Sequence, residues 1–182
     1  MISLTEYNQD EFHLLHAKTV ENTMRYFARE LGFADEEDFW GIVGLLHDLD
    51  EEQCDWQHNM SVHGPTSVEI LKKEGIDDSV LGDAIKAHNP KCGMKAKTNL
   101  QYALLAADPM SGFVKAVAQI YPDKKIASVK HKSVMKRFNE LRFASGANRD
   151  YMEAIEFTGL SLDDLIDVAL EEMGAIADVL GL

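Results

Sequence analysis

Apolar residues recur along most of the chain at the three- and four-residue spacing of an α-helix, and no stretch alternates with the two-residue period of a β-strand. A last apolar stripe runs from Leu162 to Leu180. We therefore expect an all-α, irregular helical bundle. The predicted helices cover residues 10–31, 35–49, 65–75, 78–89, 99–120, 127–141 and 148–157, with a final helix from residue 162 onward.

Glycine, proline and capping residues mark the ends of several of these helices. Gly32 follows the first helix as a C′ glycine, and Pro65 suits the first position of the third. Ser161 and Asp164 have the spacing of a capping box before the last helix. Pro109 lies inside the apolar pattern of residues 99–120, which predicts either a kinked helix or two helices there.

The chain has 182 residues, and a chain of this length buries roughly 70% of its unfolded surface. We see no internal repeat or low-complexity linker, so we expect a single domain over residues 1–182. Cys54 and Cys92 form no CxxC motif, the first ten residues resemble no signal peptide, and no apolar run approaches ~18 residues. These features predict a cytoplasmic protein without membrane contact.

The net charge of the chain is −13, so the phosphate backbone of a nucleic acid is not an expected partner. Acidic residues gather in 35–38 and 163–172, which we interpret as solvated helix faces. Basic residues concentrate in 91–97 and 124–149. This asymmetry either attracts a small anionic substrate to one side of the protein or is simply another solvated face.

The stretch from Gly44 to Asp50 leads apolar residues directly into an adjacent histidine and aspartate, His47 and Asp48. A carboxylate at the end of a buried run must be paired, hydrogen-bonded or bound to a metal. Nitrogen and oxygen donors together suit Zn, Fe or Mn. The simpler interpretation is a helix end that carries polar residues. Asp50, two residues further on, is expected to face the following loop.

Four other polar residues lie at predicted helix ends or on buried faces: His16, His63, His88 and Asp108. Each has an ordinary explanation by itself: a core histidine, a loop histidine, a histidine at a helix C-terminus and a carboxylate beside a proline kink. A single metal site accounts for all of them together with His47 and Asp48 more economically.

The order of these six residues resembles the HD-domain superfamily of metal-dependent phosphohydrolases, over residues 16–108. The resemblance implies a metal-site core over about residues 10–120, with the helices of 127–182 packed on it. It also implies one ion held by the minimal pattern and a second ion of the two-metal branch, bridged by Asp48. The implied first set is His16, His47, Asp48 and Asp108, and the second adds His63 and His88. No Gly-Tyr-Pro motif follows, so the HD-GYP subgroup and cyclic-di-GMP cleavage are disfavoured.

The resemblance implies hydrolysis of a small phosphate ester, with a nucleotide as the favoured substrate and two divalent ions (Fe, Mn or Zn) as cofactors. Two such ions can clamp the attacking and the leaving oxygen of a phosphoryl displacement, which makes Asp48 catalytic as their bridge. A di-iron oxygenase, such as the superfamily member myo-inositol oxygenase, and a non-catalytic nucleotide sensor are the alternatives. The sequence leaves open whether the chain forms a homo-oligomer.

Substrate-binding residues are harder to identify from the sequence. Lys115 lies seven residues after Asp108, so it shares that face if the helix continues through Pro109, and it would then bind a phosphate. The alternative is a surface lysine. Trp56, in the loop after the His-Asp pair, either borders the site or packs in the core. The remaining histidines comprise one expected to support the site, His13, and two expected on the surface, His58 and His131.

Overall fold

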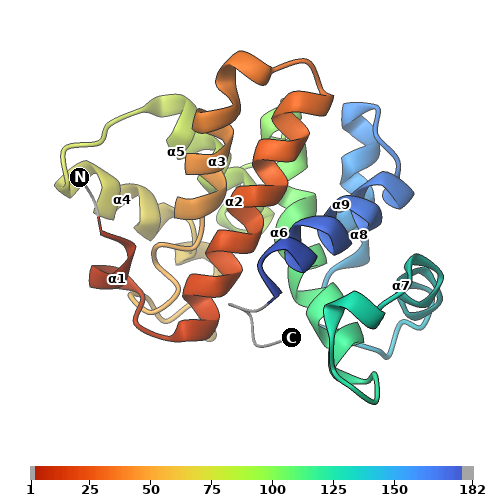
Figure 1. Ribbon diagram of the computed structural model, residues 1–182. Helices are drawn as coiled ribbons and strands as arrows, with labels where there is room; N and C mark the ends of the chain where they lie inside the picture. The colour runs from red at the N-terminus through yellow and green to blue at the C-terminus, as the bar shows by residue number, and fades with distance from the viewer. Residues whose placement is uncertain (1–2, 178–182) are drawn as a thin grey trace.

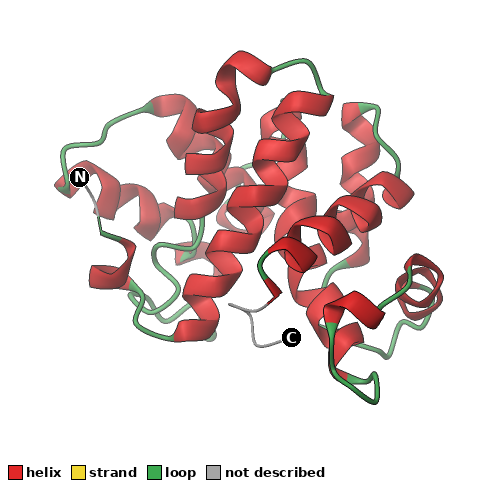
Figure 2. Ribbon diagram, in the orientation of Figure 1, coloured by secondary structure: helices red, strands yellow, loops and turns green. Residues whose placement is uncertain are grey.

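The computed structural model describes residues 3–177, and all regular secondary structure in this range is helical (Figure 1, Figure 2). The all-α prediction is therefore confirmed. The α-helices are α1 (Leu4–Tyr7), α2 (Glu11–Glu30), α3 (Glu37–Leu46), α4 (Pro65–Lys73), α5 (Ser79–His88), α6 (Asn99–Gln119), α7 (His131–Phe138), α8 (Arg149–Glu153) and α9 (Leu162–Ala175). Short 3₁₀ segments are η1 (Ala34–Glu36), η2 (Met60–Val62), η3 (Pro90–Cys92), η4 (Ile126–Ser128) and η5 (Ala154–Thr158).

Side-chain caps fix the starts of the long helices at or close to the predicted positions. The Asp78 carboxylate accepts hydrogen bonds from the first turn of α5, and Thr98 and Ser161 begin α6 and α9 with capping boxes. Helix α6 continues through Pro109, so residues 99–119 form one helix rather than two. Asp108 and the residues after Pro109 consequently keep their helical spacing.

The predicted helices over 127–141 and 148–157 are too long. Helix α7 covers only His131–Phe138, because η4 and the extended residue Val129 precede it and turns follow it. Helix α8 ends at Glu153, where the chain tightens into η5. The single turn of α1 was not predicted, and the expected stripe residue Leu180 lies outside the described residues.

Helices α2 and α6 run through the middle of the molecule, with α3, α4 and α5 on one side and α7, α8 and α9 on the other (Figure 1). Their apolar stripes meet in a continuous core whose largest side chains include Met24, Phe27, Trp40 and Phe113, all essentially inaccessible to solvent. A core of this kind holds α2, α3 and α6 in fixed positions relative to one another. Within residues 3–177, no helix is both long enough and apolar enough to cross a membrane.

Helices α2 and α3 approach each other closely at Gly44. A Cβ atom added to Gly44 would lie 2.8 Å from the carbonyl oxygen of Val20, which is backbone and cannot move aside easily. Only glycine therefore permits this distance between the two helices. The contact lies three residues before His47, so it brings the end of α3 against the face of α2 that carries His16.

Candidate metal centre

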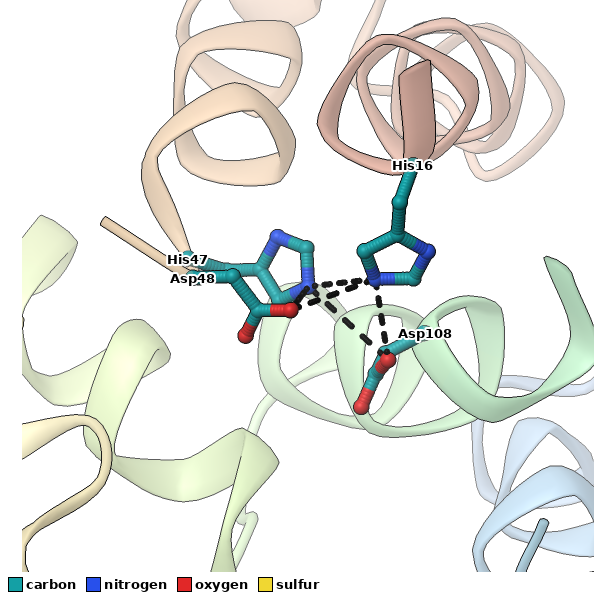
Figure 3. A group of neighbouring side chains, drawn as sticks. All are labelled: His16, His47, Asp48 and Asp108. Atoms are coloured by element: carbon teal, nitrogen blue, oxygen red, sulfur yellow. Dashed lines mark hydrogen bonds and ion pairs between the residues drawn. The ribbon is translucent and has the colours of Figure 1, made fainter. Parts of the chain in front are cut away.

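The six predicted site residues come from separate elements and converge at one place. His16 lies on α2, His47 and Asp48 follow the end of α3, and Asp108 lies in the middle of α6 (Figure 3). His63 precedes α4, and His88 is the last residue of α5. The structure thus brings together all six residues that the sequence analysis selected, in two groups that share Asp48.

The first group surrounds the Oδ2 atom of Asp48. The Nε2 atoms of His16 and His47 each lie 3.2 Å from this oxygen and 3.3 Å from each other. Asp108 Oδ1 lies 3.3 Å from His16 Nε2 and 3.9 Å from His47 Nε2 (Figure 3). Two imidazoles and two carboxylates therefore face a common point.

The second group surrounds the other oxygen of the same carboxylate. His63 Nε2 lies 3.3 Å and His88 Nε2 3.4 Å from Asp48 Oδ1, and these two nitrogens are 3.0 Å apart. Asp48 Oδ1 is buried, and no donor among residues 3–177 makes a hydrogen bond to it. A buried carboxylate oxygen without a donor is costly unless a cation neutralises it. This oxygen therefore fits a metal ligand.

Three of the histidines, His16, His47 and His88, are held by a hydrogen bond at Nδ1, and the fourth, His63, is held by an ion-pair contact there, which leaves Nε2 directed into the cluster. A histidine ligand commonly donates its second N–H to a protein oxygen, which fixes its tautomer and orientation. The Nδ1 contacts are His16 with Ser111 Oγ (2.8 Å), His47 with Gly44 O (2.7 Å), His63 with Asp50 Oδ1 (2.9 Å) and His88 with Ile85 O (2.5 Å). The donor set and its support thus fit divalent ions such as Zn, Fe or Mn.

The electrostatics of the cluster favour positive charge between its carboxylates and imidazoles. Burial by itself lowers the pKa of an imidazole, but Asp108 and Asp48 raise the pKa of His16 to about 9. The same two carboxylates outweigh burial at His47 and raise its pKa to about 10. Burial would raise the pKa of Asp48, yet the surrounding histidines hold it well below its usual range. A divalent cation supplies positive charge of this kind.

The prediction that Asp50 faces the loop is wrong, because its side chain is completely buried. Asp50 Oδ2 accepts hydrogen bonds from the backbone N–H groups of Gly64 (2.8 Å) and Ser67 (3.1 Å), at the start of α4. Its Oδ1 contacts His63 Nδ1. The chain turns under α4 after Asp48 instead of entering solvent, so Asp50 stabilises the positive N-terminus of α4 and orients His63.

An open cavity of about 290 Å³ lies over the cluster, and His16, Asp48, His63 and Asp108 form part of its wall. Glu51 lies on this wall and was not predicted. Burial, and secondarily the Asp48 carboxylate, raise the pKa of Glu51. Its position three residues after Asp48 is the signal that a sequence analysis could have used.

Aromatic side chains and His13 complete the wall of the cavity. Trp56 and Phe12 line it, and the Trp56 ring centre lies 6.2 Å from that of His63. Trp56 thus borders the site rather than packing in the core. His13 Nε2 lies 3.9 Å from Glu51 Oε1.

The other residues considered in the sequence lie at varied distances from this cavity. Lys115 borders a separate hollow beside His16, with its ammonium nitrogen 3.8 Å from the centre of the Phe12 ring, and burial lowers its pKa. Cys54 lies next to Asp50 and His63, within reach of the outer side of that histidine. The two expected surface histidines pair with exposed carboxylates, His58 with Asp55 and His131 with Asp163 and Asp167.

Comparison with known families agrees with this geometry. The family model described as the HD domain matches residues 14–129, which covers most of the chain and includes all six clustered residues. No curated protein and no solved structure gives a match. The helical fold and the histidine–aspartate cluster define a candidate metal-binding protein, and the family match identifies the family to which it belongs. The chain belongs to the HD-domain family, whose members are generally metal-dependent phosphohydrolases.

Proposed function

We propose that this protein hydrolyses a small phosphate ester, with a nucleotide as the favoured substrate, and that it uses two divalent metal ions. The observation that carries the proposal is the division of histidines between the two oxygens of Asp48. His16 and His47 face Oδ2, whereas His63 and His88 face Oδ1. A carboxylate with a separate pair of imidazoles at each oxygen is suited to bridge two ions.

The first ion would be held by His16, His47 and Asp108, and the second by His63 and His88, with Asp48 shared between them. Four imidazoles favour Fe, Mn or Zn over Mg. When bound, such ions act as Lewis acids on a phosphoryl group and lower the pKa of water. Side chains of the protein itself would supply the proton donor and the contacts to the rest of the substrate.

Glu51 is suited to carry a proton during the reaction. It lies on the same cavity wall as Asp48, and its raised pKa keeps a larger fraction of its carboxyl protonated than in water. A carboxyl in this state can donate a proton to the oxygen of a departing alcohol or nucleoside. His13 is held by Glu52, whose Oε1 lies 2.8 Å from His13 Nδ1, and at 3.9 Å its Nε2 is too far from Glu51 Oε1 for direct proton transfer.

The aromatic side of the cavity supports a nucleotide over a simple phosphate. Trp56 and Phe12 line the same cavity as the clustered carboxylates, and Phe12 is 45% exposed. A purine or pyrimidine could stack on either ring while its phosphate lies over the cluster. Lys115 remains a candidate for binding that phosphate, from the neighbouring hollow beside His16.

The same six donors also favour a second function, because four imidazoles and two carboxylates suit iron that activates O₂. The two reactions differ in what they need from the metal. Hydrolysis needs a Lewis acid, so Mn should support it without oxygen, whereas oxygen activation needs a redox-active ion.

The test is to load the protein with Mn under anaerobic conditions and measure phosphate release from nucleotides and sugar phosphates. We expect release from at least one nucleotide, with Glu51→Gln lowering kcat about 100-fold while the metal content is unchanged. Glu153→Gln, at the end of α8, is the matched control. Turnover only with iron and O₂ would establish the oxygenase instead, and binding without any turnover would establish a nucleotide sensor.

A further inference from the structure

A groove leads away from the metal centre along residues that do not include Phe12. The cavity over the cluster shares Met60, His63 and Asp108 with a second hollow of about 200 Å³. That hollow shares Lys91 and Asn148 with a third of about 480 Å³. Because each hollow has wall residues in common with the next, the three hollows are adjacent and extend from the candidate ligands to Lys91 and Arg149.

Lys91 lies where the second and third hollows meet, in the η3 turn three residues after His88. The buried side chain of Asn89 fixes this turn. Its Nδ2 donates hydrogen bonds to the carbonyl oxygens of Met60 (2.6 Å) and His63 (2.9 Å), and its Oδ1 accepts one from the backbone N–H of Lys91 (3.2 Å). The backbone of Lys91 is therefore held in a fixed position relative to the metal centre.

The groove contains polar donors that the protein itself does not use. Among the residues that the structure describes, no protein acceptor binds the exposed Lys91 ammonium, the Tyr151 hydroxyl or the side-chain N–H group of Asn148, whose Oδ1 accepts from the backbone N–H of Tyr151. Arg149 also lines the third hollow, but its guanidinium already makes hydrogen bonds within the protein. Its guanidinium donates to three backbone carbonyls, those of Phe143, Ala144 and Ala147.

The charge of the groove is opposite to that of the whole protein. The net charge is −13, yet among the described residues that line the second and third hollows Asp108 is the only carboxylate, and it belongs to the cluster. Uncommitted ammonium, hydroxyl and amide donors along one wall make a suitable environment for an anion. The basic segment 91–97 of the sequence therefore contributes Lys91 to this wall.

We propose that Lys91, with Tyr151 and Asn148, binds a second anionic group of the substrate, either a phosphate or a carboxylate, while the phosphate to be cleaved lies at the metal centre. This inference rests on the proposed function and narrows its substrate class. The preferred substrate carries two separated negative groups, the second of them at Lys91.

Binding of non-hydrolysable probes tests the proposal independently of turnover. The probes are propylphosphonate, 3-phosphonopropionate and propane-1,3-bisphosphonate, which differ only in the group at the far end. Calorimetry on the Mn-loaded protein without oxygen should show that at least one doubly anionic probe binds about fivefold to tenfold tighter than propylphosphonate. Lys91→Met should remove this preference and leave propylphosphonate binding unchanged. Lys95→Met, an exposed lysine of the same loop that lines none of the hollows, should retain it.

The two doubly anionic probes identify the second group. A preference for the bisphosphonate alone supports a second phosphate, and a preference shared by 3-phosphonopropionate supports a site that also accepts a carboxylate. Equal binding of all three probes, or a preference that survives Lys91→Met, would overturn the proposal. Loss of phosphate release from every ester with the probe preference intact would reject the hydrolase and leave the anion site standing.

Discussion

The two halves of the metal centre are built in different ways. The first half takes His16 from α2, His47 from the end of α3 and Asp108 from α6, three helices that the core fixes directly. The second half takes His63 from a loop and His88 from a helix end. Each half contains a deeply buried histidine, His47 in the first (0% exposed) and His88 in the second (2% exposed), and Asp108 is the most exposed donor at 30%.

This difference shows what each half depends on. Core packing brings the first set of donors together, so this half should tolerate changes in the loops. The second half relies on buried polar side chains, because Asp50 orients His63 and Asn89 holds the loop and η3 together. Its geometry should therefore fail when single hydrogen bonds are lost. Asp48 is the one residue that both halves share, and it gives the most severe test.

Asp48→Ala should abolish the binding of both ions and all phosphate release, because each half loses its shared oxygen donor. The free energy of unfolding of the metal-free protein should fall, because the clustered imidazoles, whose pKa values Asp48 raises, lose their shared anionic partner. Elemental analysis and urea unfolding provide the two measurements. A variant that retains two ions per chain would show that Asp48 is not a ligand.

Asp50→Asn should damage the second half and spare the first. An amide cannot both accept from the N–H groups of Gly64 and Ser67 and present an acceptor to His63 without leaving a buried group unsatisfied. We expect the second ion to bind about 10- to 100-fold more weakly and the apo protein to lose about 1–3 kcal/mol. Metal titration and urea unfolding measure these effects.

The matched control for that change is Asp55→Asn, an exposed acid in the same loop whose one ion-pair partner within residues 3–177 is His58. It should leave both properties within error, since surface ion pairs contribute little. Equal weakening of both ions by Asp50→Asn would mean that the two halves do not have separate supports.

Gly44→Ala tests the packing that builds the first half. The new Cβ would lie 2.8 Å from the Val20 carbonyl oxygen, so α3 must move away from α2 and carry His47 with it. We expect a loss of about 1–3 kcal/mol in the free energy of unfolding and weaker binding of the first ion. A Cβ at Gly174 in α9 would make only an ordinary van der Waals contact, 4.0 Å from Ile126 Cγ2, so Gly174→Ala should be neutral or stabilising by up to about 1 kcal/mol. An unchanged stability for Gly44→Ala would show that the helices can separate freely.

The contrast between the halves also explains how far the sequence could predict this site. Helical periodicity and capping residues located α2, α5, α6 and α9, and the polar residues at helix ends and on buried helix faces included all six clustered side chains. Asp50 was wrongly assigned to the loop because its burial depends on how the chain turns beneath α4, which no local pattern encodes. Glu51 was missed although its spacing of three residues from Asp48 is visible in the sequence.

The short helices show a related limit. Helix α7 is short and amphipathic, and neither η4 before it nor the turn at Ala144 after it is specified by the periodicity of apolar residues. The groove at Lys91 could not be predicted either. Its wall combines η3 with residues near α8, which are far apart in the chain and meet only in the folded protein.

The smallest effect is expected at His131, which resembles His63 in contacting two carboxylates but lies at the surface. Its ring nitrogens are each 2.6 Å from a carboxylate oxygen, of Asp167 at Nδ1 and of Asp163 at Nε2, and these contacts raise its pKa above the ordinary value of 6.5. The raised pKa in the folded state means that the pair stabilises the fold fully below pH 6.5. The stabilisation then declines as the pH rises through the folded-state pKa.

Because the side chain is one-third exposed, His131→Gln should cost only about 0.5–1 kcal/mol at pH 6. The difference from the unaltered protein should shrink steadily at higher pH, which urea unfolding at a series of pH values can follow. The metal content should not change, since α7 carries none of the clustered residues. A cost that grows with pH would contradict the sign of this pKa shift. Any loss of metal would contradict the separation of α7 from the metal centre.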